Sequence, residues 1–400
     1  MTPESPVVIV GGGIGGVSTA LCLQRHAIPF LLLEQAPAFG EIGAGIQLSA
    51  NAMRLLQRLG LGTQILEIGV RPRGLEIRSW HNGERILWTP LGEAADRKFG
   101  APYVHAHRAE VMNVLVRALG TDHVRFATHV LGYEQDRRGV AAILDSGERV
   151  QGSVLIGADG IHSAVRNQMF GDGKPRYSGN VAWRGTLPAE RIAQLGFEKL
   201  SSSWWGPQRS IVHYFISSGR TMNWIGISRA PESGRESWSA TGKVADALKE
   251  FEGWPASLRE MIAATERLNR MAIYDREQLP AWGKGRVALL GDSAHAMLPF
   301  HAQGAAQSIE DAWVLAGCLA KGGRNVAAAL RSYERIRKPR ADWVQAFSRA
   351  AEELFHMTDA KAIERRNARL AENQQRYSEG FPEGQIKLYA YDAEEALHAA

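Results

Sequence analysis

The stretch VVIVGGGIGGVSTALCLQRHAIPFLLLE, residues 7–34, decides the fold. Apolar runs at its two ends predict buried strands, and the segment between them has helical spacing. Its glycines occur as Gly11-x-Gly13-x-x-Gly16, where the first strand gives way to the helix. Gly11 permits a tight turn, Gly13 lets the backbone approach a pyrophosphate, and Gly16 lets the helix pack closely on the strand. The stretch therefore predicts a βαβ unit that binds a dinucleotide.

Two further features of this stretch support a dinucleotide over a merely tight turn. The beginning of the helix, which includes Ile14 and Gly15, presents free N–H groups and a partial positive charge to phosphate. Glu34 ends the second strand, 18 residues after Gly16, where its carboxylate can bond both hydroxyls of an adenosine ribose. Because an acid at this position repels a 2′-phosphate, FAD or NAD is favoured over NADP.

A second place where a predicted strand ends in a turn, here called a strand exit, lies in LIGADGIHSAVR, residues 155–166. The first is the glycine loop after residues 7–10. The apolar run ends at Gly157 and is followed by Asp159 and Gly160. Two interpretations stay open: Asp159 contacts the cofactor, or it caps the helix that follows.

A third strand exit lies in GDSAHAMLPFHAQGAAQSIEDA, residues 291–312. Asp292, at the mouth of a strand, can hold the hydroxyls of a ribityl chain. Gly304 and Ala305 begin a helical pattern whose N–H groups can face an anion. A reduced flavin carries negative charge at the N1–C2=O end of its ring, so this stretch predicts the flavin half of the same site.

Composition excludes several classes of protein. The chain has 400 residues, of which 45% are hydrophobic and 22% charged, as in a soluble protein of about two domains. No apolar run approaches the ~20 residues of a membrane span, and the N-terminus lacks the basic start of a signal peptide. Cys22 and Cys318 fall in helical patterns, which indicates a reducing compartment, the cytoplasm, with no disulfide framework and no metal cluster. The net charge of +5 suits anionic ligands, and the scattered Lys and Arg disfavour nucleic acid.

The pattern of elements predicts an α/β protein (α+β overall) in which a Rossmann-type FAD domain is interrupted by an antiparallel sheet. A hairpin around Asn82-Gly83 and alternating, Trp-rich segments after residue 177 form the inserted sheet. The expected divisions are an FAD-binding domain of 1–75, 104–176 and 277–340, a substrate-binding sheet domain of 76–103 and 177–276, and a C-terminal helical segment of 341–400.

These anchors together resemble the single-component FAD-dependent aromatic hydroxylases. This family of flavoprotein monooxygenases includes relatives of salicylate hydroxylase, 3-hydroxybenzoate 6-hydroxylase and 6-hydroxynicotinate 3-monooxygenase. The matching stretches run in family order over roughly 1–340: GGGIGG, FGEIGAGIQLSANAMRLLQRLGL, HR at 107–108, GADGIHSAVR, AWRG, YDRE and GDSAHAMLPFHAQGAAQSIEDA. The resemblance implies a glutathione-reductase-like FAD fold with an inserted substrate sheet and no separate nicotinamide domain.

The resemblance also implies roles for residues that match the family's motifs. The glycine loop and Glu34 would bind the ADP half of FAD, and Arg108 would lie near the pyrophosphate. Asp159 would serve both FAD and the nicotinamide cofactor. The flavin half would be held by Asp292 at the ribityl chain and by Gly304 and Ala305 at N1 and O2.

In such a family NADH or NADPH reduces the flavin, dioxygen adds to its C4a carbon, and the hydroperoxide delivers an OH group to an electron-rich ring. The cofactor supplies this chemistry, and the protein supplies placement and exclusion of water. Aromatic residues of the sheet are candidates for the lining, although about half of them must serve ordinary sheet packing. These are Trp183, Trp204, Trp205, Tyr214, Phe215 and Trp224.

Four positions are candidates for contact with the substrate or the flavin. Tyr214 falls on the tyrosine that family members place over the substrate, and Pro299 can hold a carbonyl against substrate or flavin. His301 is expected to be a base or a substrate anchor, with loop packing as the open alternative. Gln47 can reach the flavin edge or cap a turn.

Other polar residues are expected to be structural. Ser210 falls where several family members carry a histidine base. His213 is one residue from Tyr214, so strand alternation points it away from Ser210 and Tyr214. His295 is expected to pack in the strand-exit turn.

The resulting prediction is a hydroxylase of a small aromatic or heteroaromatic compound that carries a hydroxyl and a carboxylate, with Arg184 or Arg220 as candidate anchors for the carboxylate. The alternatives are a hydroxylase of a non-acid aromatic compound, a flavin-binding redox sensor, and a plain NAD-dependent dehydrogenase. The dehydrogenase leaves GADG and GDSAH unexplained. The sequence leaves open the substrate, the position hydroxylated, an accompanying decarboxylation, NADH versus NADPH, and whether the chain forms a homodimer.

Overall fold

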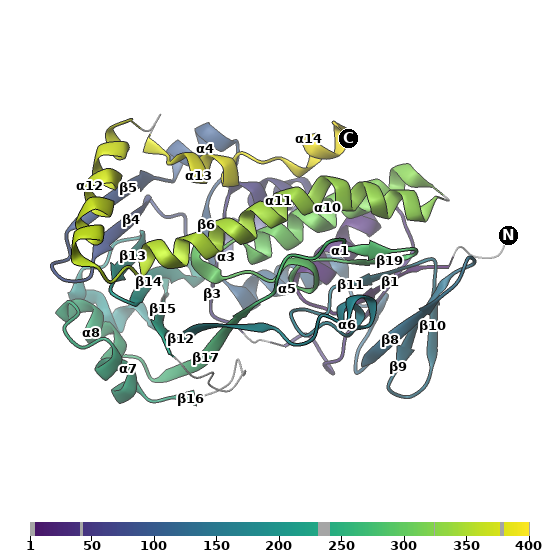
Figure 1. The fold of residues 1–400 in the computed structure, drawn as a ribbon, viewed down its shortest axis with the longest axis horizontal. Coiled ribbons are helices and arrows are strands. Elements are labelled where there is room, and N and C mark those ends of the chain that lie inside the picture. The colour runs from purple at the N-terminus through teal and green to yellow at the C-terminus, as the bar shows by residue number, and fades with distance from the viewer. Residues whose placement is uncertain (1–4, 41–42, 231–240, 324, 377–379, 400) are drawn as a thin grey trace.

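The structure is a computed structural model that describes residues 5–40, 43–230, 241–323, 325–376 and 380–399. Two sheets lie side by side along the long axis of the molecule, and one long helix, α11 (Val326–Phe355), runs across both (Figure 1). The chain passes from the first sheet to the second and back twice before it forms this helix.

A six-stranded sheet in the order β18-β19-β11-β1-β2-β7 forms the core of the first part. Its parallel strands are β1 (Val7–Val10), β2 (Phe30–Leu33), β7 (Val124–Arg125), β11 (Val154–Gly157) and β19 (Val287–Leu289), with β18 (Gly283–Lys284) antiparallel at one edge. The strands β1, β2, β11 and β19 carry no charged residue, because both faces of the sheet are covered. Helix α1 (Ile14–Arg25) packs against β1 and β2, and the strands β9 (Val140–Leu144) and β10 (Arg149–Gly152) contact β11 and β1. Since the parallel strands run in one direction, their carboxyl ends meet at one edge.

Three helices of this part pack side by side, with α1 (Ile14–Arg25) against both α5 (Arg108–Leu119) and α10 (Gly304–Gly322). Around them lie the helices α2 (Ala50–Arg58), α3 (Gly62–Ile68), α4 (Glu93–Phe99) and α9 (Asp292–His295), and the strand pair β3 (Gly45–Leu48) and β6 (Val104–His107).

A three-stranded antiparallel sheet flanks the parallel one. It consists of β8 (Val130–Gln135), β9 (Val140–Leu144) and β10 (Arg149–Gly152), and α6 (Ala164–Phe170) packs against β8. The turn between β9 and β10 contains Ser146 and Gly147.

The second part is an eight-stranded sheet in the order β16-β17-β12-β15-β14-β13-β4-β5. Its strands are β4 (Gly74–Ser79), β5 (Arg85–Pro90), β12 (Arg176–Pro188), β13 (Ser201–Gly206), β14 (Arg209–Ile216), β15 (Thr221–Arg229), β16 (Thr241–Gly242) and β17 (Arg267–Asp275). The predicted hairpin around Asn82-Gly83 joins β4 and β5. All neighbouring strands are antiparallel except β13 and β4, which pair in parallel.

One face of this sheet is closed by helices α7 (Val244–Glu250) and α8 (Ala256–Ala263) and the 3₁₀ helix η1 (Ala189–Leu195). An apolar cluster that includes Trp183, Trp204, Trp224 and Phe251 fills this interface. The opposite face looks toward the parallel sheet, so it is the face available to a ligand held between the two parts.

The C-terminal region consists of α11, α12 (Ala360–Arg376), α13 (Glu383–Tyr389) and α14 (Ala393–His398). The predicted boundary between residues 340 and 341 falls inside the continuous α11. Arg337 in the first half of α11 bonds α10, while Phe355 at its end stacks on Trp205 of the sheet with ring centroids 4.0 Å apart. The helix is long because it has partners in both parts of the molecule.

Candidate active site

The predicted cofactor residues come together at the carboxyl edge of the parallel sheet. Glu34 follows β2, Asp159 follows β11 and Asp292 follows β19. Helices α1 and α10 begin at the same edge, and no side chain caps either N-terminus. In open α/β sheets ligands bind at this edge, where free helix N–H groups favour an anion.

The glycines of the first loop serve two different purposes. A Cβ on Gly16 would lie 1.9 Å from the Gly11 carbonyl oxygen, and one on Gly11, whose φ is +103°, would lie 2.5 Å from the Ala158 carbonyl oxygen. These two glycines are required by the fold. A Cβ on Gly13 would meet nothing within 4 Å, so Gly13 faces space that a ligand can enter.

Backbone N–H groups hold the Glu34 carboxylate in place. Gly12 N donates to its Oε2 at 2.6 Å and Ala36 N donates to its Oε1 at 2.8 Å. Each carboxylate oxygen can accept a further hydrogen bond. The carboxylate thus keeps the capacity to accept bonds on both oxygens, and its contact with a ribose stays a prediction.

Asp159 links two of the strand exits. Its Oδ1 accepts hydrogen bonds from Ser163 Oγ at 2.6 Å and from Ser293 Oγ at 3.2 Å, and its Oδ2 accepts from Val165 N at 3.3 Å. Burial raises the pKa of its carboxyl. The N-cap of α6 is Ser163, whose Oγ accepts from Arg166 N at 2.9 Å, so the interpretation of Asp159 as the helix cap is wrong. Contact between Asp159 and a cofactor stays a prediction.

Arg166 is a buried residue of this region to which the sequence pattern gave no role. Its NH1 donates to the carbonyl oxygens of Ser293 and Ala294, both at 3.2 Å, and its Nε donates to Asp172 Oδ2 at 2.6 Å. The guanidinium therefore holds the turn that presents Asp292. Its place in GADGIHSAVR, on the side of α6 that faces the turn, is the signal that could have identified it.

Asp292 lies beside the N-terminus of α10. The nearest atom to a Cβ on Gly304 would be Asp292 Oδ1, at 3.9 Å, so this side of Gly304 is open as well. Arg108, at the start of α5, lies within electrostatic range of Asp292: burial lowers the pKa of Arg108, and the Asp292 charge opposes that shift. Gly13 and Gly304 thus each border open space, and Asp292 lies beside Gly304 and within electrostatic range of Arg108.

A buried ionic network fixes α10 from behind. Asp311 Oδ2 accepts from Gly291 N at 3.0 Å and pairs with His295 Nε2 at 2.6 Å, while Asp311 Oδ1 accepts from Arg337 Nε at 2.8 Å. Arg337 also pairs with Glu310 at 2.6 Å. His295 is therefore structural, as expected, and the network ties the turn before Asp292 to α10 and α11.

Tyr214 lies on the open face of the eight-stranded sheet, next to β3. Its side chain is hydrogen-bonded with Gln47, whose Oε1 also accepts from Tyr103 OH at 2.5 Å. Burial raises the pKa of Tyr214, and the neighbouring Arg184 guanidinium opposes that rise. His105 lies against the Tyr214 ring with centroids 4.3 Å apart. Tyr214, Gln47 and Arg184 thus gather where the sheet meets the first part of the molecule.

His301 lies in the 3₁₀ helix η3 (Pro299–His301), directly before α10. Its ring stacks on Phe347 of α11, with centroids 4.0 Å apart and planes 8° apart. Burial lowers its pKa to about 4, so the imidazole is neutral at neutral pH. Among the described residues Nε2 has no hydrogen-bond partner, which leaves this nitrogen to a ligand while the ring itself packs.

Most of the aromatic residues proposed as pocket lining lie on the other face of the sheet. Trp183, Trp204, Trp224 and Phe215 pack in the cluster under α7 and α8, and Trp205 packs against Phe355. The prediction was wrong for these residues because side-chain alternation places them opposite Tyr214 or under α11. The open face is lined instead by aliphatic residues and Phe300: Ala182, Ile225, Ile227, Met271 and Leu298.

The remaining polar candidates also separate by face. His213 accepts a hydrogen bond from Trp204 Nε1 at 3.1 Å within the α7–α8 cluster, as the alternation predicts. Arg220 is exposed at the end of the sheet. Of the two candidate arginines, Arg184 alone lies beside Tyr214.

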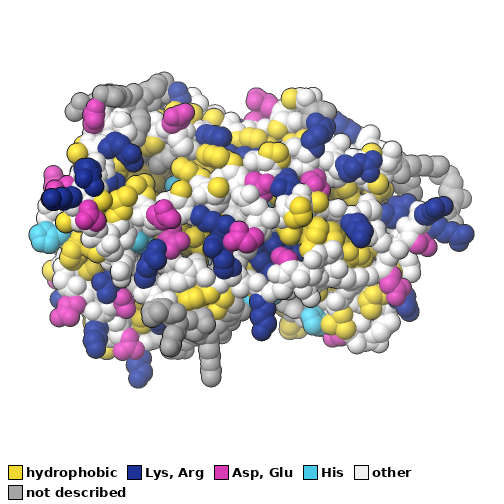
Figure 2. All heavy atoms as spheres, viewed as in Figure 1, with side chains coloured by type: hydrophobic (Ala, Val, Ile, Leu, Met, Phe, Trp, Pro, Cys, Tyr) yellow, Lys and Arg dark blue, Asp and Glu magenta, His cyan; other side chains and the backbone are white. Residues whose placement is uncertain are grey.

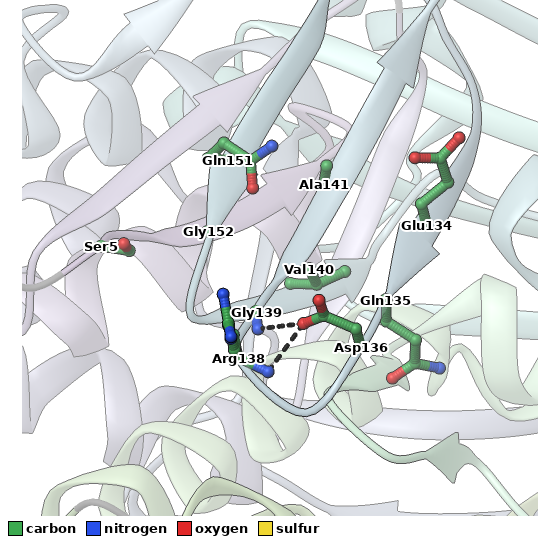
Figure 3. Close-up of a pocket in the computed structure, with 10 residues that line it drawn as sticks. All are labelled: Ser5, Glu134, Gln135, Asp136, Arg138, Gly139, Val140, Ala141, Gln151 and Gly152. Carbon is green, nitrogen blue, oxygen red and sulfur yellow. Dashed lines mark hydrogen bonds between the residues drawn. The ribbon is translucent and has the colours of Figure 1, made fainter.

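A hollow in another region does not belong to this site. Figure 3 shows it at the turn between β8 and β9, where Asp136 accepts from the backbone N–H groups of Arg138 and Gly139 at 2.7 and 2.9 Å. None of the predicted cofactor or catalytic residues lines it.

The face drawn in Figure 2 shows no continuous basic patch of the kind that binds nucleic acid, because basic and acidic side chains are intermixed on it. Arg176 and Arg349 both pair with Asp275, for example. Within the described ranges no helix has the length and apolar character needed to cross a bilayer. The same residues include no cluster of His, Cys, Asp and Glu that could hold a metal ion.

Comparison with known proteins agrees with this geometry. A model of the FAD binding domain family matches residues 4–348. The chain is 38% identical over 368 residues to 3-hydroxybenzoate 6-hydroxylase 1 of Aquipseudomonas alcaligenes. This alignment covers 90% of this chain and 92% of that protein. The chain is 37% identical over 353 residues to the 3-amino-4-hydroxybenzoate 2-monooxygenase PtmB3 of Streptomyces platensis, with 88% and 89% covered.

The fold also matches that of a solved relative, Klebsiella pneumoniae HpxO complexed with FAD and uric acid. The TM-score is 0.85 at 26% sequence identity, over 99% of this chain and 98% of that one. The predicted glutathione-reductase-like α/β fold is confirmed. Because the family model spans most of the sequence and the relatives align over nearly their whole lengths, the chain belongs to the FAD binding domain family of flavoprotein monooxygenases, the hydroxylases of aromatic compounds.

Proposed function

We propose that this protein binds FAD along the carboxyl edge of the parallel sheet and uses NADH or NADPH and dioxygen to hydroxylate a small aromatic or heteroaromatic acid that carries a ring hydroxyl. The observation that carries the proposal is the pair of open glycines. Gly13 and Gly304 stand at two uncapped helix N-termini, and a Cβ on either would meet no atom closer than 3.9 Å. A group with two separate anionic parts, as FAD has in its pyrophosphate and its reduced flavin ring, fits this arrangement.

The residues of the chain divide FAD between them. The α1 N–H groups and Arg108 would hold the pyrophosphate, and Glu34 would accept from the ribose hydroxyls. Asp292 would accept from the ribityl chain, and the N–H groups of Gly304 and Ala305 would face the flavin ring. When bound, FAD supplies the reduction of dioxygen to an electrophilic oxygen donor.

The substrate would lie between η3 and the open face of the sheet. Aliphatic side chains and Phe300 exclude water there, which protects a reactive oxygen donor. Tyr214 and Gln47 would orient the ring by hydrogen bonds, with Pro299 and His301 on the flavin side. A ring hydroxyl that loses its proton becomes a stronger electron donor, so a nearby proton acceptor speeds attack on the ring.

A carboxylate on the substrate is supported by Arg184. Arg184 is a half-buried residue beside Tyr214. The positive charge of its guanidinium favours a negatively charged carboxylate nearby. The names of two relatives, a 3-hydroxybenzoate 6-hydroxylase and a 3-amino-4-hydroxybenzoate 2-monooxygenase, support the same class of hydroxylated aromatic acid.

The test is a substrate panel with purified, FAD-loaded protein. The panel contains 3-hydroxybenzoate, salicylate, 6-hydroxynicotinate and 3-amino-4-hydroxybenzoate, each beside its uncharged carboxamide. We expect at least one acid to accelerate oxidation of NADH or NADPH and to gain one oxygen atom from ¹⁸O₂, detected by mass spectrometry. The matched carboxamide should be at least about tenfold poorer, since it lacks the charge that Arg184 favours.

The alternatives give different results in the same assay. A redox sensor would bind FAD but show no substrate-stimulated oxidation of either nucleotide. Equal activity with acids and carboxamides would support a hydroxylase of non-acid aromatic compounds. A protein that retains no FAD would refute the proposal altogether.

A further inference from the structure

Two buried side chains meet at the wall of the proposed substrate space. Ser210 Oγ and His356 Nε2 lie 2.9 Å apart. Ser210 belongs to β14, while His356 directly follows α11 as its C-cap. Only 6% of Ser210 and 4% of His356 is exposed, so the bond is shielded from water.

The register of the sheet puts this pair on the face of Tyr214. Ser210, Val212 and Tyr214 alternate along β14 toward one side. Ser210 pairs with Ile227 of β15, which packs with Leu298 and lies in the same apolar cluster as Phe300. The Phe300 ring also stands edge-on to His356, with centroids 5.4 Å apart. The pair therefore borders the space between η3 and the sheet.

The imidazole of His356 is fixed and neutral. Gln208 N donates to the His356 carbonyl oxygen at 3.1 Å, so the turn before β14 holds the backbone of this residue. Burial, with a smaller contribution from the Arg229 charge, lowers the pKa of His356 to about 4. A neutral imidazole has one nitrogen free to accept a proton.

Docking of α11 on the sheet does not depend on this bond. The end of the helix is already anchored by Leu354 and Phe355, which pack with Ile77 and Trp205. Burying the serine and histidine side chains at this point costs desolvation free energy, which an aliphatic contact would avoid. The pair is thus better explained by a role toward a ligand.

We propose that Ser210 and His356 form a relay that takes the proton from the ring hydroxyl of the substrate; this rests on the proposed hydroxylase function. The substrate O–H bond breaks, and its electron pair stays on the ring oxygen. The proton passes to Ser210 Oγ, whose own proton passes to His356 Nε2. When the hydroxylated ring regains aromaticity, the proton it releases restores a neutral hydroxyl group and the imidazolium returns its proton to solvent or product. Ser210 touches the substrate, and His356 is a positioning residue that acts through it.

The test uses substrates whose ring hydroxyls differ in acidity. Ser210→Ala and His356→Gln should lower kcat about 100-fold for the least acidic hydroxyl, the lower end of general-base effects. This loss in kcat should become smaller as ring substituents make the hydroxyl more acidic. It should disappear for a substrate whose hydroxyl is already ionised in solution. Ser210→Thr keeps the hydroxyl and should retain most of the wild-type rate. His213→Gln changes a buried imidazole on the far face of the same sheet, and it should leave the dependence on acidity unchanged.

A binding measurement tests the relay without turnover. A nitro-substituted phenolic acid absorbs visible light only as its phenolate, so absorbance reports the ionisation of the bound ligand. The pKa of the bound ligand should be at least about one unit higher in Ser210→Ala and His356→Gln than in wild type, equivalent to a tenfold change. A uniform loss of rate across all substrates, or an unchanged ligand pKa in folded variants, would overturn the relay. If wild type hydroxylates nothing, the proposed function fails, while the ligand pKa still decides whether the relay exists.

Discussion

Two glycines of the first loop should respond in opposite ways to the same substitution. Gly16→Ala puts a methyl group 1.9 Å from the Gly11 carbonyl oxygen, inside backbone that cannot move without displacing β1. Gly13→Ala puts a methyl group into space with no atom within 4 Å, at a residue whose φ of −72° suits alanine. The first change should therefore damage the folded apoprotein, and the second should damage FAD binding alone.

The expected magnitudes differ clearly. Overpacking against rigid backbone should cost Gly16→Ala at least about 3 kcal/mol, which lowers Tm by about 4 °C or more for a chain of this length. Gly13→Ala should change the stability of the apoprotein by less than about 1 kcal/mol, the difference between glycine and alanine at a helix N-cap. If its methyl group costs the FAD complex about 2.7 kcal/mol, FAD affinity falls about 100-fold.

Thermal melting of the apoprotein with and without FAD separates the two effects. At FAD concentrations about 100 times the wild-type Kd, wild type gains about 2.7 kcal/mol from binding, whereas Gly13→Ala gains about 0.4 kcal/mol. Gly13→Ala should therefore melt near wild type without FAD and show almost no rise with it. The reasoning is refuted if Gly13→Ala binds FAD as wild type does, or if it melts as early as Gly16→Ala without the cofactor.

Three other perturbations follow from the buried groups. Asp311→Asn should lower the free energy of unfolding by about 3 kcal/mol, because Arg337 loses one of its two buried carboxylate partners and keeps Glu310. Asp342→Asn in the more exposed Lys338 pair should cost less than about 0.5 kcal/mol in the same denaturant titration. Tyr214→Phe should retain FAD but lower kcat/KM about tenfold through the lost hydrogen bond, and unchanged coupling of NAD(P)H to product would contradict its role. Four buried imidazoles have pKa values of about 3 to 4 in the fold, below the usual 6.5, so protons favour the unfolded chain and stability should fall as pH drops from about 6.5 to 4. Replacing one of them should reduce that slope by up to about 1.4 kcal/mol per pH unit, measured for His213→Gln; the four are His105, His213, His301 and His356.

Local patterns in the sequence predicted the residues whose role depends on neighbours in the chain. Gly11, Gly13 and Gly16 are interpretable because a strand and a helix flank them. The outward alternation of His213 follows from its distance to Tyr214 along one strand. These inferences need no knowledge of which strands pair.

Residues whose partners lie far along the chain escaped prediction. His356 meets Ser210, 146 positions away, and Arg166 meets the carbonyl of Ser293, 127 positions away. The tryptophans were misplaced for a related reason. Which face of a strand is covered depends on where α7 and α8 return, and alternation alone does not say which side they take.

The bond between Asp159 and Ser293 has a consequence for how the protein is made. It joins residues 134 positions apart. The parts of the proposed FAD site, from the glycine loop to Asp292, therefore leave the ribosome at different times. The glycine loop emerges almost at once, but the turn at Asp292 follows only when nearly three-quarters of the chain has been synthesised. At about 5–20 residues per second this interval lasts roughly 15–60 s. If FAD binds as proposed, it would stabilise the finished fold and would not guide the early folding of the nascent chain.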